Sequence, residues 1–303
     1  MAEEIPFRRE MQFEYGVPRE LFPGIERLVA NNPGPFTYKG TNTYLIGQGA
    51  TVAVMDPGPD DDAHFEATMK AIGKRKVSTI IVTHTHHDHV DGLPRLLAAT
   101  GAKTAGFGSK VADSGKRKSS PSGGEYVEHD FVPDLVLGDG ARLEGDGFAL
   151  EALHTPGHAP DHLCFGLEGT KILFSGDHVM AWNTSVVAPP EGKMAHYMRS
   201  LEKLTQRSDE VFLPGHGGRV VQPRRVVKAF MVHRRMREDA ILDCIRQGRT
   251  SIAEIVEVVY RGLEPRLVNA ASLSVAAHVE HLVERGLVRS AGSVMRPENL
   301  SAV

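Results

Sequence analysis

Thr83-His84-Thr85-His86-His87-Asp88-His89 is the stretch of this 303-residue chain that decides the fold. Four side chains able to bind a metal fall in it at i, i+2, i+4 and i+5, a spacing that neither one helix face nor one strand face directs to a single point. We therefore expect a loop to carry them. Ser78 to Thr83 is apolar and β-branched, as in a buried parallel strand, and Asp91 to Ala99 is typical of a helix start. A strand end followed by a helix is a usual place for ligand binding in open α/β sheets.

Three further candidate ligands, His158, Asp177 and His216, repeat this setting. Each follows a short segment that is typical of a strand, and each has Gly or Pro beside it in H-T-P-G-H, F-S-G-D-H or L-P-G-H-G. The preceding segments are residues 148–153, 171–174 and 211–213. Four such coincidences favour a metal site over chance.

Imidazole and carboxylate ligands together suit zinc, iron or manganese, and no thiolate is placed to change that preference. Seven ligands exceed the needs of one tetrahedral ion, so we predict two ions, with zinc as the first choice. Asp177 is the candidate bridge because a carboxylate can bind through both oxygens. The first ion is assigned to His84, His86 and His158, and the second to Asp88, His89 and His216. A bridging hydroxide would complete both ions, since bound metal lowers the pKa of water from about 15.7 toward ~7. No protein nucleophile is then required.

The other histidines near the motifs receive different interpretations. His87 occupies the variable position of the first run and is expected to be exposed. His154, His162 and His178 are interpreted as outer groups that fix the tautomers of the ligands. The candidate catalytic residues are Asp88, which holds the metal, and His178 and Tyr197, which are candidates for protonating the leaving group.

The motifs T-H-x-H-x-D-H, T-P-G-H, S-G-D and P-G-H-G resemble those of the metallo-β-lactamase superfamily. That resemblance implies an α/β fold, a four-layer αβ/βα sandwich with the metals at one edge of the two sheets. The segments Asn32 to Gly47 and Asp161 to Phe165 resemble the LACTB2-like branch. In animals that branch is known as a single-strand-specific endoribonuclease of mitochondria, and in bacteria mostly as hydrolases of undetermined substrate.

The resemblance also excludes some relatives. Zinc β-lactamases carry Cys or Ser where this chain has Asp177, and flavodi-iron proteins carry Glu where it has His86. Nucleases of the cleavage-factor type insert a domain before the last His, whereas only 39 positions separate Asp177 from His216 here. Hydrolases of thioesters, lactones or phosphodiesters remain.

The composition indicates the general class of protein and its compartment. A chain with 41% hydrophobic and 24% charged residues is ordinary for a soluble globular protein. Cys164 and Cys244 are interpreted as small buried hydrophobes rather than a disulfide, which favours a reducing compartment. The N-terminus has no apolar signal region, and no apolar run approaches the ~18 residues of a membrane span. We expect a cytoplasmic protein without membrane contact.

Two domains are predicted, a metal-binding catalytic domain over residues 1–223 and a helical, winged-helix-like domain over residues 224–303. In the first domain, Ser109 to Gly124 is interpreted as a surface loop, with a lid as the alternative, and Trp182 to Pro190 as a wall of the substrate pocket. In the second, the patterns predict helices over residues 224–247, 250–260 and 269–285.

The segment from Arg219 to Arg289 carries 13 Lys/Arg against 8 Asp/Glu, although the whole chain is at −3. This excess of positive charge is compatible with RNA binding by Arg234, Arg235 and Arg237, because contacts with phosphates supply most of the non-specific affinity of proteins for nucleic acid. The alternative is a solvated face on helices that cover the active site or form a homodimer.

Two function classes follow. The first is a metal-dependent hydrolase, acting on single-stranded RNA or, like a glyoxalase II, on a small ester, thioester or lactone. An open basic channel would favour RNA, and a closed apolar cleft walled by Trp182 would favour the small substrate. The second class is a nucleic-acid-binding regulator with a vestigial metal domain, which the intact ligand set disfavours.

Overall fold

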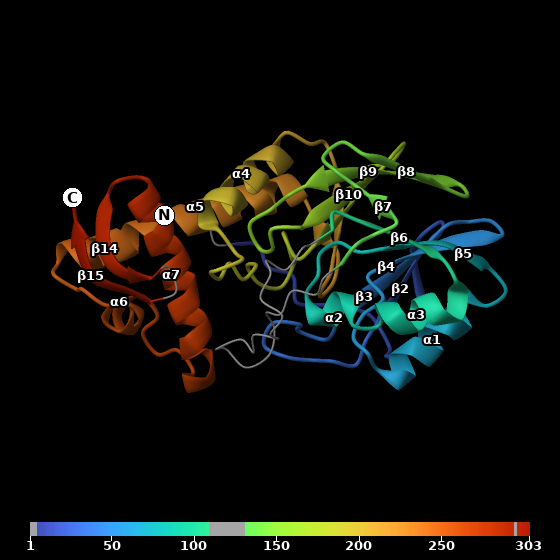
Figure 1. Cartoon of the computed structure of the whole chain (residues 1–303), viewed down its shortest axis with the longest axis horizontal. Coiled ribbons are helices and arrows are strands. Elements are labelled where there is room, and N and C mark those ends of the chain that lie inside the picture. The colour runs from blue at the N-terminus through green and yellow to red at the C-terminus, as the bar shows by residue number, and fades with distance from the viewer. Residues whose placement is uncertain (1–4, 109–130, 294–295) are drawn as a thin grey trace.

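The computed structural model describes residues 5–108, 131–293 and 296–303. The segment Ser109 to Gly124, predicted to be a surface loop or lid, lies outside these residues. Within them, two large β-sheets pack against each other through a shared apolar core, and a smaller helical unit extends from one end (Figure 1).

The first sheet holds the strand that precedes the histidine-rich run. Its order follows the chain, with parallel pairing from β4 to β7 and antiparallel pairing from β1 to β4. The strand predicted over residues 78–83 is β5, which begins slightly earlier. The strands are β1 (Arg19–Phe22), β2 (Ile25–Val29), β3 (Asn42–Ile46), β4 (Thr51–Met55), β5 (Lys76–Ile81), β6 (Lys103–Gly106) and β7 (Leu135–Val136).

The second sheet carries the other three candidate ligands. Its order is β13-β12-β11-β10-β9-β8, and only β11 and β12 pair in parallel. The three predicted strands are found as β9, β11 and β12. The strands are β8 (Arg142–Gly145), β9 (Phe148–His154), β10 (Leu163–Leu167), β11 (Ile172–Gly176), β12 (Val211–Pro214) and β13 (Val220–Val221).

Both sheets are apolar on both faces, as the alternation of side chains along a strand shows. On β3, Tyr44 and Ile46 pack between the sheets, whereas Leu45 packs on the opposite face against the helices. On β11, Phe174 faces the other sheet and Leu173 faces outward. Each sheet must therefore be covered on its outer face as well.

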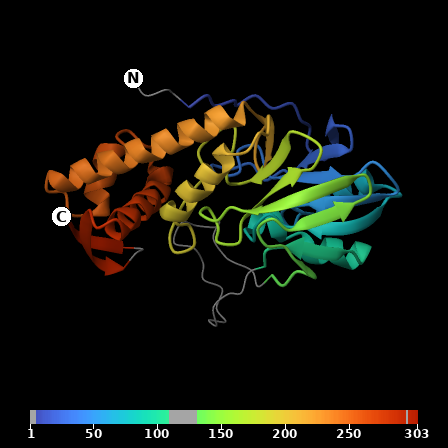
Figure 2. The same ribbon diagram turned by 90° about the horizontal axis from the view of Figure 1, so that it is seen from above.

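Helices supply that cover. α1 (Asp62–Ile72) and α3 (Leu93–Thr100) pack on the first sheet, and α4 (Met194–Thr205) and α5 (Pro223–Arg246) pack on the second. Figure 2 shows the layers from above. The predicted αβ/βα sandwich is confirmed.

The C-terminal unit contains α6 (Ile252–Val259), the short 3₁₀ helix η1 (Pro265–Leu267), α7 (Val268–Glu284) and the hairpin of β14 (Val288–Ser293) and β15 (Arg296–Ala302). Ser251 caps α6 through a capping box with Glu254, as the Thr250-Ser251 pair predicts. These elements have their own apolar core, which includes the second half of α5. Helices followed by a β-hairpin wing match the predicted winged-helix character.

The long helix α5 belongs to both units. Val226, Val227 and Phe230 in its first half pack with the second sheet, whereas Ile241 and Ile245 in its second half pack with α6 and α7. The predicted boundary after residue 223 falls at the start of this shared helix, and it stays a prediction (Figure 2).

Across the described ranges, none of the helices combines the length and the apolar character needed to span a membrane.

Candidate metal centre

The histidine-rich run lies directly after β5, but a loop carries only part of it. His84 and His86 are in the loop, whereas Asp88 and His89 lie on the one-turn helix α2 (His87–Val90). The prediction that a loop carries all four ligands is therefore wrong for two of them, because one helical turn is enough to direct neighbouring side chains to different sides of one site. His87, predicted to be exposed, is half-buried, and its Nδ1 lies 2.9 Å from Asp91, because it is on the one-turn helix beside Asp91.

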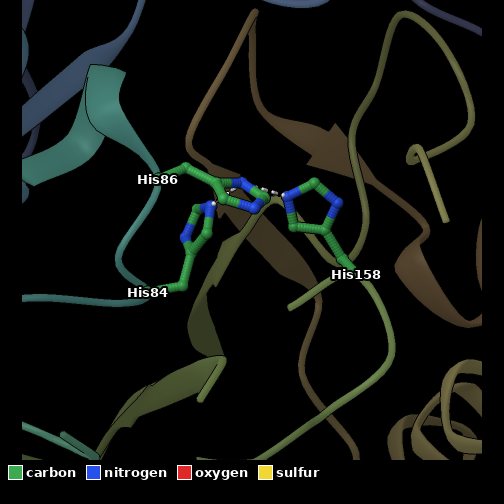
Figure 3. A group of neighbouring side chains, drawn as sticks. All are labelled: His84, His86 and His158. Carbon is green, nitrogen blue, oxygen red and sulfur yellow. Dashed lines mark hydrogen bonds between the residues drawn. The ribbon is translucent and has the colours of Figure 1, made fainter. Parts of the chain in front are cut away.

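His84, His86 and His158 form the first group of potential ligands, and all three side chains are buried. Figure 3 shows them converging from the loop after β5 and from the loop after β9. The Nδ1 atom of His86 lies 3.0 Å from Nε2 of His84 and 3.0 Å from Nε2 of His158. Three nitrogen atoms at this separation can share one metal ion.

Asp88, His89 and His216 form the second group. Nε2 of His216 lies 3.1 Å from Oδ2 of Asp88 and 3.4 Å from Nε2 of His89. The structure thus brings together the residues assigned to each ion, and their role as ligands stays a prediction.

Asp177 lies between the two groups. Its Oδ1 is 3.5 Å from Nε2 of His89, and its Oδ2 is 3.2 Å from Nε2 of His216 and 3.7 Å from Nε2 of His158. Among the described side chains, the Oδ1 atom has no hydrogen-bond partner although it is buried. A carboxylate that faces both groups has the position that a bridging ligand requires.

Two glycines allow this close approach. A Cβ atom on Gly215 would lie 2.3 Å from Oδ1 of Asp177 and 2.6 Å from His89, and one on Gly176 would lie 2.5 Å from Nε2 of His162. Gly176 also has a φ of 46°, which disfavours other residues. The glycines in S-G-D and P-G-H-G thus permit the packing of the ligands.

Outer hydrogen bonds orient the imidazole rings. The Nδ1 atoms of four ligands face a side-chain or backbone oxygen, which leaves Nε2 to point inward. The partners are Thr83 Oγ1 for His84 at 3.0 Å, Asp56 Oδ2 for His89 at 2.9 Å, Val186 O for His158 at 2.7 Å and Gly40 O for His216 at 3.2 Å.

His86 has the opposite orientation. Its Nδ1 points inward and its Nε2 faces Oε2 of Glu191 at 3.9 Å. Sequence reasoning missed Glu191, which precedes α4, and Asp56, which follows β4. Asp56 has a signal that could have been used, since M-D-P-G is a carboxylate at a strand end followed by turn residues, as at the other ligands.

The first sheet also fixes the loop that carries His216. The Asn42 side chain donates to the carbonyls of Pro214 and Gly217, and the Tyr44 hydroxyl donates to Pro214 O at 2.7 Å. Thr41 Oγ1 donates to Oδ2 of Asp88 at 2.8 Å. The segment from Thr41 to Tyr44 therefore contacts both Asp88, which follows the first sheet, and the loop of His216, which follows the second.

The electrostatics of the site fit metal cations. Burial, together with the neighbouring imidazoles, lowers the pKa of His158 to about 4, so this ring is neutral and able to bind metal at neutral pH. Burial also disfavours a charged His216, but Asp177 and Asp88 outweigh it and raise its pKa to about 10. Within the described chain, neither carboxylate forms an ion pair with Lys or Arg. Among the described residues, buried Asp177 and half-buried Asp88 have histidines as their only cationic partners, so metal ions would supply positive charge that the site lacks.

A cavity of about 20 Å³ opens onto these ligands. Besides the ligands, its walls are Phe36, Thr37, Met180 and Val186, and none of the described residues that line it is Lys or Arg. The segment predicted to form a wall does so through Val186 alone. The prediction is wrong for Trp182, which stacks on Tyr38 with ring centroids 4.9 Å apart and does not line the cavity.

Residues 37–216 match the family described as the metallo-beta-lactamase superfamily, which covers more than half of the chain. The chain belongs to the metallo-beta-lactamase superfamily. Residues 251–296 match the beta-lactamase associated winged helix domain, in agreement with the C-terminal unit.

Relatives support this placement in the superfamily. The chain is 31% identical over 283 residues to a beta-lactamase-like protein 2 homolog of Drosophila melanogaster, covering 89% of this chain and 93% of that protein. It is 29% identical over 251 residues to the atrochrysone carboxyl ACP thioesterase AgnL7 of Paecilomyces divaricatus, covering 80% of this chain and 73% of that protein. A metallo-beta-lactamase family protein from Thermus thermophilus superposes with a TM-score of 0.73 at 25% identity, over 92% of this chain and 100% of that one. This chain is thus a superfamily hydrolase of the beta-lactamase-like protein 2 type.

The two candidate proton donors of this metallo-beta-lactamase superfamily member lie away from the cavity. His178 and Tyr197 are fully buried next to each other, and the Tyr197 hydroxyl donates to the His178 carbonyl at 2.9 Å. Neither side chain lines the cavity, so their catalytic role stays a prediction without geometric support.

Of the other two histidines predicted to be outer groups, His162 contacts a ligand and His154 does not. Nε2 of His162 accepts from the Asp177 amide at 3.1 Å, and its Nδ1 lies 2.9 Å from Thr155 Oγ1, so His162 supports a ligand. His154 instead contacts Pro160 O and stacks on Phe107, away from the ligands.

Two of the three arginines proposed to contact RNA have partners inside the protein. Arg234 is 4% exposed and donates to Ser185 O, and Arg237 donates to Val259 O at 2.9 Å and lies over the Tyr260 ring. Arg235 alone is exposed. The RNA-binding prediction is therefore wrong for Arg234, because its guanidinium is used inside the protein.

Proposed function

We propose that this protein is a dinuclear zinc hydrolase of small acyl thioesters. The observation that carries the proposal is the cavity beside five of the seven candidate ligands, whose remaining walls are largely apolar and, among the described residues, include no basic side chain. A binding site for single-stranded RNA combines positive charge along the backbone with aromatic platforms for the bases. At about 20 Å³ the cavity admits a single small group such as a carbonyl, and the apolar side chains beside it suit the adjoining acyl chain instead.

The proposed ligand sets are the two groups joined by Asp177. The first ion would be held by His84, His86 and His158, and the second by Asp88, His89 and His216. When bound, the metals would supply a Lewis acid for the carbonyl oxygen and an activated water as nucleophile, as zinc, iron or manganese can. Outer groups such as Asp56 beside His89 and the Val186 carbonyl beside His158 would hold the imidazole rings in the orientation that this requires.

The cavity walls support water as the nucleophile. No Ser or Cys lines the cavity within the described residues, and the Thr37 hydroxyl donates to Asn32 O at 2.6 Å. The cavity therefore offers no side chain to which the acyl group would become attached. We expect hydroxylamine to trap no acyl-enzyme.

The same walls favour a thioester over an oxygen ester. A thiol has a pKa of about 8–9, so a thiolate can leave at neutral pH without a proton donor, whereas an alkoxide needs one. Apart from the candidate ligands, no described residue that lines the cavity is a titratable acid. The thioesterase among the relatives is consistent with this choice.

The proposal is tested by assaying zinc-loaded protein on acyl thioesters of increasing chain length, on the matching oxygen esters, and on single-stranded RNA. We expect turnover of short thioesters, slower turnover of the esters, and no RNA cleavage. Asp88→Ala is the blank for contaminating activity. RNA cleavage that the Asp88→Ala variant lacks, without thioester turnover, would replace this proposal by the endoribonuclease alternative.

A further inference from the structure

A second cavity lies on the outer side of the loop that carries His216. It has a volume of about 320 Å³, which is at the lower end of the range for small-molecule sites. The charged residues that line it are Arg8, Arg19, Arg27, Arg219, Glu10 and Glu20. Four arginines against two glutamates give the walls a net charge of +2, and the lining is distinct from that of the metal cavity.

Arg27 is the unusual member of this set. It is located on β2 and is 4% exposed, so its charge is buried at a cost that a partner must offset. Its nitrogen contacts are two backbone carbonyls, Gln12 O at 2.9 Å and Gly217 O at 3.5 Å, and Nε has no hydrogen-bond partner among the described residues. Burial and the nearby Arg19 charge lower the pKa of Arg27.

The other three guanidinium groups are exposed and surround the cavity. Arg19 donates to the Gln12 side chain at 2.6 Å. Over the described ranges, none of the four arginines forms an ion pair with a carboxylate, although Glu10 and Glu20 line the same cavity. The guanidinium donors that these contacts do not use therefore remain available for a ligand.

We propose that this cavity, which we name the arginine pocket, binds a phosphate dianion, either free or as a phosphomonoester. Planar guanidinium groups match the oxygens of phosphate through paired hydrogen bonds. A net charge of +2 balances one dianion, and among the described residues the walls contain no aromatic side chain on which a nucleobase could stack. The site is separate from the metal centre and does not depend on the thioesterase proposal.

Calorimetric titration with inorganic phosphate and with glycerol 3-phosphate tests the proposal, at constant ionic strength. We expect one saturable site per chain. Tighter binding of glycerol 3-phosphate assigns the pocket to a phosphorylated metabolite, and tighter binding of inorganic phosphate assigns it to the free ion. Absence of saturable binding for both compounds overturns the proposal.

Variants locate the bound anion. Arg219→Gln removes an exposed guanidinium and should weaken binding by roughly 10- to 100-fold, as expected for the loss of a hydrogen bond to a charged group. Arg27→Gln should weaken it at least as much, provided that its melting curve shows a folded protein. Arg261→Gln, an exposed arginine on the C-terminal unit, should bind as the wild type does.

The titration is repeated on metal-stripped Asp177→Ala protein, since phosphate could also bind at the metals. We expect unchanged affinity. Loss of phosphate binding in that variant, or wild-type affinity in Arg219→Gln, would place the anion elsewhere and overturn the proposal.

Discussion

Asp56→Asn is the substitution that most sharply tests how outer groups control the ligands. The Asp56 carboxylate accepts three hydrogen bonds, from Thr83 N and Thr83 Oγ1 at 2.8 Å each and from Nδ1 of His89 at 2.9 Å. Its φ of 53° is one that Asn tolerates, so the exchange keeps shape and backbone. What changes is one acceptor oxygen, which becomes an NH₂ donor.

The exchange has a predictable effect on His89. If the amide oxygen accepts from Thr83 N, the NH₂ group faces Nδ1 of His89 and favours the tautomer with the proton on Nε2, the atom that faces the other ligands. Loss of such an outer partner typically costs 10–100-fold in metal affinity, or about 1.4–2.7 kcal/mol. We expect a loss of this size for the ion of the second group only.

Zinc affinity is measured by competition with a chromophoric chelator, for wild type, Asp56→Asn and Asp60→Asn. Asp60 is an exposed aspartate four positions away, and its exchange removes the same charge without touching a ligand. We expect two affinities in the control and one weakened affinity in Asp56→Asn. Equal affinities in all three proteins would refute the role given to Asp56.

Three further predictions follow from the structure. Asp177→Ala should lose at least one of two bound ions, because the Asp177 carboxylate lies against His158 of the first group and against His89 and His216 of the second; elemental analysis that finds two ions in the variant would contradict this. Glu238 has its pKa lowered to about 2, since its contacts with His278 at 3.8 Å and His281 at 2.6 Å outweigh the effect of burial. Its stabilisation is therefore complete above pH 4.5 and is lost as the pH falls toward 2. Glu238→Gln should cost roughly 1–2 kcal/mol at pH 7 and less below pH 4.5, as thermal melting at several pH values would show; a constant difference would count against it. Arg234→Glu should destabilise the fold by about 3 kcal/mol or more, because it buries an unpaired charge, whereas exposed Arg235→Glu should change it by less than about 0.5 kcal/mol; equal melting temperatures would disprove the burial argument.

The sequence predicted which candidate ligands lie close together. The spacing of these residues and the strand that precedes each of them were two independent indications of one site. Four segments each placed a metal-binding side chain just after a strand, and the strand ends of two packed sheets bring such residues together. The split of ligands between loop and helix α2 was missed, since one helical turn leaves no periodic pattern to detect.

Residues that act through contacts between distant segments were harder to find. Glu191 faces His86 although the two residues are more than a hundred positions apart in the sequence. The residues around each of them show no pattern that predicts this contact. Arg234 was interpreted as a surface charge because it lies in a basic run, yet its turn of α5 faces the segment that contains Ser185. Burial of a long cationic side chain is decided by the packing of whole helices, which the sequence does not display.

Trp182 illustrates the same limit within one segment. A lone tryptophan after the bridging carboxylate suggested a pocket wall, but Gly217 leaves space beside its ring and Tyr38 stacks on it. The cavity is instead walled by Phe36, Met180 and Val186, which have no distinctive pattern in the sequence.

We propose that the two groups joined by Asp177 hold two metal ions. Anomalous diffraction from a crystal of the zinc-loaded protein, collected above and below the zinc absorption edge, tests it most directly. We predict two zinc peaks per chain, one beside His84, His86 and His158 and one beside Asp88, His89 and His216, with Asp177 touching both. A single peak, or two peaks that leave Asp177 without a metal contact, would contradict the claim.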